Sequence, residues 1–319
     1  MKKLLLALLI PAMIFAGTER KKVENTFDVK ESHEIIIKAV NGCDLRVVGW
    51  EELKVKFDLD VTVTSSDKNY EKEYIENFKI REDIGNIRAV FEMEKFERSA
   101  IWGIKDLLTL NFGTSIETEI KGVIYVPMKN YFELELKYGE VELSEISGEI
   151  VLESRSSKIE LVNCPNIRGI ENDYGELKIK KSGGNSKFEI RSGIVDISSF
   201  SGKLDLTSEY GKIGISEISE DLKIESRSAD IKINGVGGNL EIVAPYSNLN
   251  ISDVKGTVQV EDRSSEIKIT DVGAIKLDAP YSNVFVRNVS GINSLTNEFK
   301  LQSGSLDIAN AKGNLVVND

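Results

Sequence analysis

The sequence predicts an all-β protein that folds as a single-stranded β-helix, or β-solenoid, in which one chain winds into stacked coils. Three observations support this fold class. A short phrase recurs about every 18 residues, apolar and polar residues alternate on both sides of it, and small residues punctuate each repeat. A repeat of this length cannot bury its own apolar face, so the repeats have to stack on one another.

A column of alternating large and small residues defines the repeat. Aligned on this position, the copies carry, in chain order, Tyr138, Ser156, Tyr174, Ser192, Tyr210, Ser228, Tyr246, Ser264, Tyr281 and Ser303. Successive members lie 18 residues apart, except for the last two steps of 17 and 22 residues. We therefore expect about ten coils over residues 127–319.

Two strands are expected in each unit. Leu204 and Leu206 precede Tyr210, Ile213 and Ile215 follow it, and such alternation with a period of two is typical of strands. A small residue directly after the column marks one tight bend, and a glycine about nine residues later marks a second. Five propeller blades of two units each are an alternative, but near-identical columns every 18 residues favour coils stacked about 4.8 Å apart.

The alternation of tyrosine with serine is interpreted as a packing device at one corner of the coils. Tyrosines in every coil would crowd that corner, whereas small neighbours leave space for each ring. The residue before the column should then point to the opposite face, and it reads Arg155, Asp173, Arg191, Glu209, Arg227, Pro245, Arg263 and Pro280. Its first five members are expected to form an exterior ladder of alternating charge that helps to fix the register.

A binding stripe is the functional alternative for the same residues. In that interpretation the tyrosines and the arginines contact a sugar or an anionic polymer. The candidate binding residues are Tyr138, Tyr174, Tyr210, Tyr246, Tyr281, Arg155, Arg191, Arg227 and Arg263.

The segment 17–126 does not follow the repeat and is predicted to cap the solenoid with further strands and one helix at about 66–79. Tyr70, Tyr74 and Phe78 share one face of that helix. A terminal coil exposes unpaired strand edges and an open core, so a divergent segment there is typical of a cap.

An apolar stretch at 99–113 contains Trp102. It is predicted to be a strand and hairpin packed on the cap. The alternative is an exposed loop that contacts a partner or a membrane surface through Trp102.

Residues 1–16 have the layout of a secretory signal peptide. Lys2 and Lys3 precede an apolar run that is too short to span a bilayer, and cleavage is expected after Ala16. We therefore expect an exported protein that is periplasmic, cell-surface or secreted, with no transmembrane segment after cleavage. Cys43 and Cys164 are far apart, and both are predicted to be buried, unpaired thiols.

Charge and motifs limit the chemistry. The net charge of −11 repels phosphate backbones, which excludes nucleic acid as a partner. The single histidine, His33, has no nucleophile motif near it, and the glycine- and aspartate-rich repeat of calcium-binding β-rolls is absent. The recurring carboxylates each stand beside a cation, as in a solvated ladder, and they are Glu153, Asp173, Glu209, Glu225 and Asp262. We therefore predict no catalytic, metal-binding or cofactor-binding residue.

The phrases "NGCDLRVVGW" and "IYVPMKNYFELELKYGEVELSEISGEIVLESRSSKIEL", followed by serial "SG" or "YG" corners, carry a resemblance. Over about residues 40–317 the chain resembles the putative adhesin family of exported bacterial proteins, which is related to the auto-transporter adhesin head domains. The resemblance implies a right-handed β-helix outside the cytoplasmic membrane, with no catalytic residue to carry over. This chain departs from the common Ser-Gly corner by using tyrosine in alternate coils.

The function predicted from these observations is that of a non-enzymatic, adhesin-like scaffold or binding surface at the cell envelope. Its expected partners are a cell-envelope polysaccharide or another surface protein. The last strand, in "GNLVVND", is also expected to pair end to end with a second copy or with a surface. The alternative function is that of a carbohydrate-active β-helix, either a polysaccharide lyase or a hydrolase.

Overall fold

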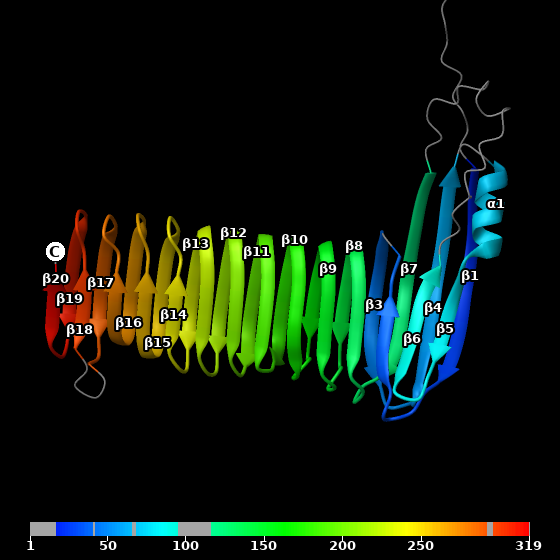
Figure 1. Ribbon diagram of the computed structural model, residues 1–319, viewed down its shortest axis with the longest axis horizontal. Helices are drawn as coiled ribbons and strands as arrows, with labels where there is room; N and C mark the ends of the chain where they lie inside the picture. Colours follow the sequence, from blue (N-terminus) through cyan, green and yellow to red (C-terminus); the bar gives the residue numbers. More distant parts are fainter. Residues whose placement is uncertain (1–16, 41, 66–67, 95–115, 292–295, 319) are drawn as a thin grey trace, which may run out of the picture.

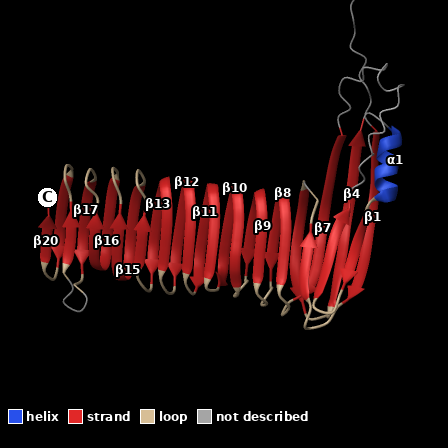
Figure 2. Ribbon diagram, in the orientation of Figure 1, coloured by secondary structure: helices blue, strands red, loops and turns tan. Residues whose placement is uncertain are grey.

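The computed structural model describes residues 17–40, 42–65, 68–94, 116–291 and 296–318. These residues form a long rod of strands, with the N-terminal strands at one end and the C-terminus at the other (Figure 1). The one helix of the described ranges lies against the outside of the N-terminal end (Figure 2). The prediction of an all-β solenoid is confirmed.

Six long strands form the central coils, and each passes through the first bend without interruption. They are β8 (Phe132–Ser144), β9 (Ile150–Val162), β10 (Ile167–Gly183), β11 (Ser186–Ser201), β12 (Leu204–Ile218) and β13 (Leu222–Val236). Neighbours pair in parallel, so that Ser192 lies between Tyr174 and Tyr210, each 18 residues away. This parallel pairing confirms stacked coils and contradicts the propeller alternative, whose blades consist of antiparallel strands.

In the later coils the strands are interrupted at the first bend. They are β14 (Leu240–Val243), β15 (Asn248–Glu261), β16 (Glu266–Asp278), β17 (Asn283–Val289), β18 (Asn297–Lys300), β19 (Ser305–Ala311) and β20 (Leu315–Asn318). Pro245 and Pro280 stand at two of the bends that interrupt these coils. Since proline has no N–H to donate to the ladder, a strand ends there while the parallel stacking continues beyond it.

Two further coils lie inside the N-terminal segment. Its elements are β1 (Gly17–Asp28), β2 (Glu34–Lys38), β3 (Cys43–Trp50), β4 (Lys54–Ser65), α1 (Lys68–Asn77), β5 (Lys79–Ile84), β6 (Arg88–Glu94) and β7 (Ile116–Pro127). Ile35 of β2 pairs in parallel with Phe132 of β8 and with Ala89 of β6. Strand β3 likewise lies between β8 and β7. The pairs β2–β3 and β6–β7 therefore continue the two faces of the rod beyond β8.

Antiparallel strands close this end of the rod. On one face β5 pairs with β6, and on the other β4 pairs with β7 and β1 pairs with β4. The outermost strand, β1, carries Arg20, Lys21 and Lys22, and such charges discourage pairing with another chain. The predicted helix is present as α1, and Tyr74 and Phe78 are buried against the cap, 2% and 1% exposed.

Columns of apolar side chains fill the rod. In β12 the side chains of Leu204, Leu206, Ile213, Ile215 and Ile218 are all buried. The equivalent positions in β11 and β13 are apolar too, except for the buried Ser186 beside Leu204. Each such side chain contributes about 1.5 to 3 kcal/mol of gross burial energy, most of which the entropy of ordering the chain offsets.

Both cysteines belong to this core. Cys43 and Cys164 are free and buried, as predicted. Burial raises the pKa of the Cys43 thiol to about 12 and that of the Cys164 thiol to about 11. The thiols therefore act as small apolar groups and resist conversion to the reactive thiolate.

The second bend requires a left-handed backbone in each of the ten coils from β8 to β20. Nine non-glycine residues recur there with φ between 48° and 59°, and they are Glu145, Asn163, Lys181, Ser199, Glu217, Asp253, Asp271, Asn288 and Asn310. Gly235 occupies the same place in one coil, with φ of 87°. A side chain in this conformation costs about 1 to 2 kcal/mol, so the bend is a recurrent source of strain.

We expect the substitution Lys181→Gly to raise the free energy of unfolding by up to about 1 kcal/mol, because glycine adopts positive φ without steric cost. Urea unfolding would measure the change. The matched control is Lys178→Gly, in the middle of β10, which should lower stability by about 0.5 to 1 kcal/mol. Equal destabilisation by both substitutions would contradict the left-handed bend.

Candidate functional site

The first bend carries the tyrosine column on the outside of the rod. The five rings are 41% to 52% exposed, and they belong to Tyr138, Tyr174, Tyr210, Tyr246 and Tyr281. The prediction that these rings pack inside the corner is therefore wrong.

The reason is a change of phase at the bend. Before it, Leu204, Leu206 and Ser208 point inward, and after it the inward positions begin at Ile213. In a regular strand, inward residues are an even number of positions apart, but Ser208 and Ile213, on either side of the bend, are five positions apart. The bend leaves Tyr210 on the outer surface although it shares the parity of Leu204.

Small neighbours isolate each ring. Tyr174 lies in register between Ser156 and Ser192, so the next tyrosine is two coils away, about 9.6 Å along the axis. Within the described residues, none of these five rings makes an aromatic or cation contact. The rings therefore form a regular row of separate, half-exposed aromatic surfaces.

Four arginines stand in the coils between the tyrosines. Arg155, Arg191, Arg227 and Arg263 are exposed, as predicted for the residue before the column. The expected ladder of ion pairs is wrong, however, since no carboxylate oxygen of the described residues lies within 4.0 Å of these guanidinium groups. We call the five tyrosines and these four arginines the binding edge.

The other arginines of the solenoid behave differently. Arg168 forms an ion pair with Glu149 at 3.0 Å, and Arg287 forms one with Asp307 at 2.6 Å. The contrast shows that carboxylates do pair with arginine on this surface. Among the described residues, by comparison, the guanidinium groups of the binding edge form no ion pair.

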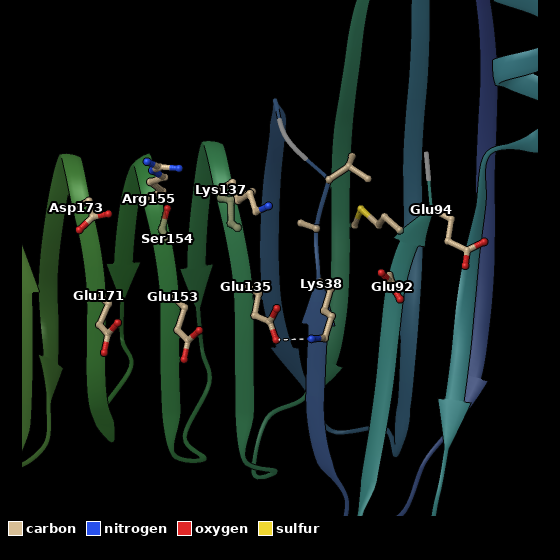
Figure 3. Close-up of a pocket in the computed structure, with 14 residues that line it drawn as sticks. Lys38, Glu92, Glu94, Glu135, Lys137, Glu153, Ser154, Arg155, Glu171 and Asp173 are labelled. Carbon is tan, nitrogen blue, oxygen red and sulfur yellow. Dashed lines mark ion pairs between the residues drawn. The ribbon is translucent and has the colours of Figure 1, made fainter. Parts of the chain in front are cut away.

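An open groove of about 930 Å³ lies beside the binding edge, where the cap meets the first coils (Figure 3). Its charged lining consists of Lys38, Glu92, Glu94, Glu135, Lys137, Glu153, Arg155, Glu171 and Asp173. Six of these nine side chains are acidic, so we call it the acidic groove. Lys38 donates to Glu135 at 2.7 Å, and this contact raises the pKa of Lys38.

Three glutamates stacked in successive coils make the groove acidic. Glu153 lies in register between Glu135 and Glu171, and like charges in such positions destabilise a sheet. Partial burial, together with Glu133, Glu171 and Glu135, raises the pKa of Glu153. The expectation that each recurring carboxylate stands beside a cation is therefore wrong for Glu153.

Two other carboxylates of that set have clear partners. Glu225 pairs with Lys223 at 3.0 Å, as expected. Asp262 is buried and accepts hydrogen bonds from the hydroxyl groups of Ser265 and Ser282, at 2.8 and 2.6 Å. Asp262 therefore has a structural role at its bend.

The remaining candidates for chemistry are few. His33 is buried, and its Nδ1 accepts a hydrogen bond from the backbone N–H of Lys30 at 3.3 Å. Among the residues that the structure describes, no group of His, Cys, Asp and Glu side chains could hold a metal ion.

The expected loop around Trp102 and the expected signal peptide, residues 1–16, lie outside the described residues. No helix in the described part of the chain is long and apolar enough to cross a membrane.

A family model described as Toastrack DUF4097 matches residues 28–238, which include α1 and the coils from β2 to β13. The chain belongs to the Toastrack DUF4097 family. The family resemblance found in the sequence is thereby confirmed.

Two solved structures are similar to the Toastrack DUF4097 chain. One is a putative cell adhesion protein from Clostridium sporogenes, with 14% identity and a TM-score of 0.26, in a match that covers 72% of this chain and 100% of that one. The other is a putative adhesin from Parabacteroides merdae, with 14% identity and a TM-score of 0.24, in a match that covers 84% of this chain and 95% of that one. No curated protein matches the chain.

The raised pKa of Glu153 predicts a pH-dependent gain in stability on substitution. The folded state holds this proton at a higher pH than the unfolded chain, so ionisation lowers stability as the pH rises, and the loss is complete above the raised pKa. We expect Glu153→Gln to be more stable than the wild type at pH 7, by less than about 1 kcal/mol because the site is well solvated.

Thermal unfolding at pH 7 and pH 3 would measure the effect, which should disappear at the lower pH. The control is Glu225→Gln, which removes the ion pair with Lys223 and should leave stability unchanged or slightly lower at pH 7. A gain of the same size in both variants would argue against repulsion in the glutamate stack.

Proposed function

We propose that this protein is an exported, non-enzymatic, adhesin-like scaffold that binds a cell-envelope polysaccharide along the binding edge. The observation that supports this function is the regular row of five half-exposed tyrosine rings. The leader-like composition of residues 1–16 supports export.

Tyrosine suits a surface that binds sugars. Its ring offers an apolar face on which the C–H face of a sugar can stack, and its hydroxyl group can exchange hydrogen bonds with sugar hydroxyls. Rows of exposed aromatic side chains are also unusual on a surface without a partner. Because the rings repeat along the axis, a polymer can contact several of them at once, and weak contacts then add up through multivalency.

Tyrosine-to-serine substitution tests this function with little risk to the fold, since serine is the residue that alternate coils already carry in this column. We expect the double variant Tyr174→Ser, Tyr210→Ser to bind purified cell-envelope polysaccharide roughly tenfold more weakly, at about 0.5 to 1.5 kcal/mol per ring. Its melting temperature should change little, because both rings are half-exposed.

The control for this experiment is Ile87→Ser, which replaces an apolar side chain that is 65% exposed on the cap. It should bind like the wild type. Undiminished binding by the tyrosine variant, or an equal loss in the control, would contradict a role for the binding edge.

A second candidate function, cleavage of a polysaccharide, is favoured by one observation at the acidic groove. Glu153 stands between two other carboxylates and has a raised pKa, and glycoside hydrolysis uses a protonated acid beside an ionised carboxylate. Turnover of a glycan panel that is abolished by Glu153→Gln would support cleavage over simple binding. Binding without turnover would remove this candidate for the glycans tested.

A further inference from the structure

The arginines of the binding edge occupy the coils that lack a tyrosine. Arg191 belongs to the coil between Tyr174 and Tyr210, and the same order holds for the other three arginines. Tyrosines and arginines therefore each repeat every second coil, about 9.6 Å along the axis, and the two series are offset by one coil.

These guanidinium groups are kept free on a surface where carboxylates are plentiful. The chain has a net charge of −11, and the two solenoid arginines away from the edge are both ion-paired. A guanidinium presents a planar set of donors that matches a carboxylate, sulfate or phosphate group. Four of them, left without a carboxylate within 4.0 Å among the described residues, have the chemistry to take acidic groups from a ligand.

We propose that the polymer bound by the edge is a linear acidic polysaccharide with one acidic group per disaccharide, lying parallel to the axis of the rod. This inference rests on the proposed function and names its ligand class. In an extended chain the disaccharide repeat is comparable to the two-coil spacing, so one sugar of each pair stacks on a tyrosine while the acidic group of its neighbour reaches an arginine.

The two halves of the edge differ in charge. In the half nearer the cap, Asp173 and Glu209 stand in the coils on either side of Arg191. In the other half the corresponding positions are Pro245 and Pro280.

Arg263 therefore has no acidic neighbour at this position, and Arg227 has one, Glu209, on one side only. Arg191 has an acidic neighbour on both sides, and Arg155 lines the acidic groove. An acidic polymer therefore meets the least repulsion at Arg263 and then at Arg227, which assigns the strongest contacts to these two arginines.

The contact has to be short-ranged. Because the whole chain is acidic, long-range attraction does not draw an acidic polymer toward it. The affinity must come from stacking and from direct pairing with guanidinium groups, and it should grow with the number of disaccharides that reach successive coils.

The test uses hyaluronan oligosaccharides of defined even length, which carry one carboxylate per disaccharide, and their carboxyl-reduced neutral counterparts. We expect the wild-type protein to bind the acidic series more tightly than the neutral series, with affinity rising with length. The double variant Arg227→Gln, Arg263→Gln should lose about tenfold in affinity for the acidic series and keep its affinity for the neutral series.

The control variant is Arg168→Gln, which removes an arginine that lies off the edge and is already paired with Glu149. It should bind both series like the wild type. Equal binding of acidic and neutral series, unaffected by the arginine variant but weakened by Tyr174→Ser with Tyr210→Ser, would overturn this inference and leave the proposed function standing. Binding of neither series, with no purified envelope polysaccharide bound, would overturn both.

Discussion

The parallel backbone ladder at an 18-residue offset is the constraint on which the rest of this structure depends. Because each residue pairs with its equivalent in the next coil, any property that recurs in the sequence becomes a continuous column along the rod. Inward columns become the apolar core, and outward columns become the binding edge and the acidic groove. A slip of one residue would exchange inward and outward side chains throughout a coil, so the buried columns also protect the register of the exposed ones.

The two bends of each coil meet different physical demands. At the second bend a positive φ is required in coil after coil, and residues with short polar side chains, such as Asn163 and Asn288, tolerate it best. At the first bend the column residue itself has an ordinary φ in most coils, with Tyr246 as an exception at φ of 67°. Where the backbone becomes left-handed directly after a tyrosine, the residue is a glycine, as at Gly139, Gly175 and Gly211 with φ of 128° to 146°. Large side chains such as tyrosine and arginine can therefore gather at the first bend with little conformational penalty.

The repeat period was enough to predict the solenoid and the free cysteines, because both follow from spacing and polarity. The expectation of two strands per unit is wrong for the central coils, where β8 to β13 each continue through the first bend as one strand, and among the predicted repeats separate strands appear only in the later coils. The orientation of Tyr210 could not be read from alternation, since the phase changes between Ser208 and Ile213 where the chain turns. Opposite charges in successive coils also did not ensure ion pairing, because Arg191 forms no ion pair with Asp173 or Glu209 although they occupy the same position in the neighbouring coils. The 18-residue repeat did not reveal the two N-terminal coils, β2–β3 and β6–β7. Between them the chain leaves the solenoid to form β4, α1 and β5, so their equivalent residues are not 18 positions apart.

A spin-label distance measurement tests the central claim, that the tyrosines lie in one straight exposed row. Nitroxides would be attached through Tyr138→Cys with Tyr210→Cys, and through Tyr138→Cys with Tyr281→Cys, while the buried Cys43 and Cys164 remain unlabelled. Four and eight coil steps predict backbone separations of about 19 and 38 Å, so the second distance should be close to twice the first. Two similar distances, as expected for a closed ring of blades, would contradict the account.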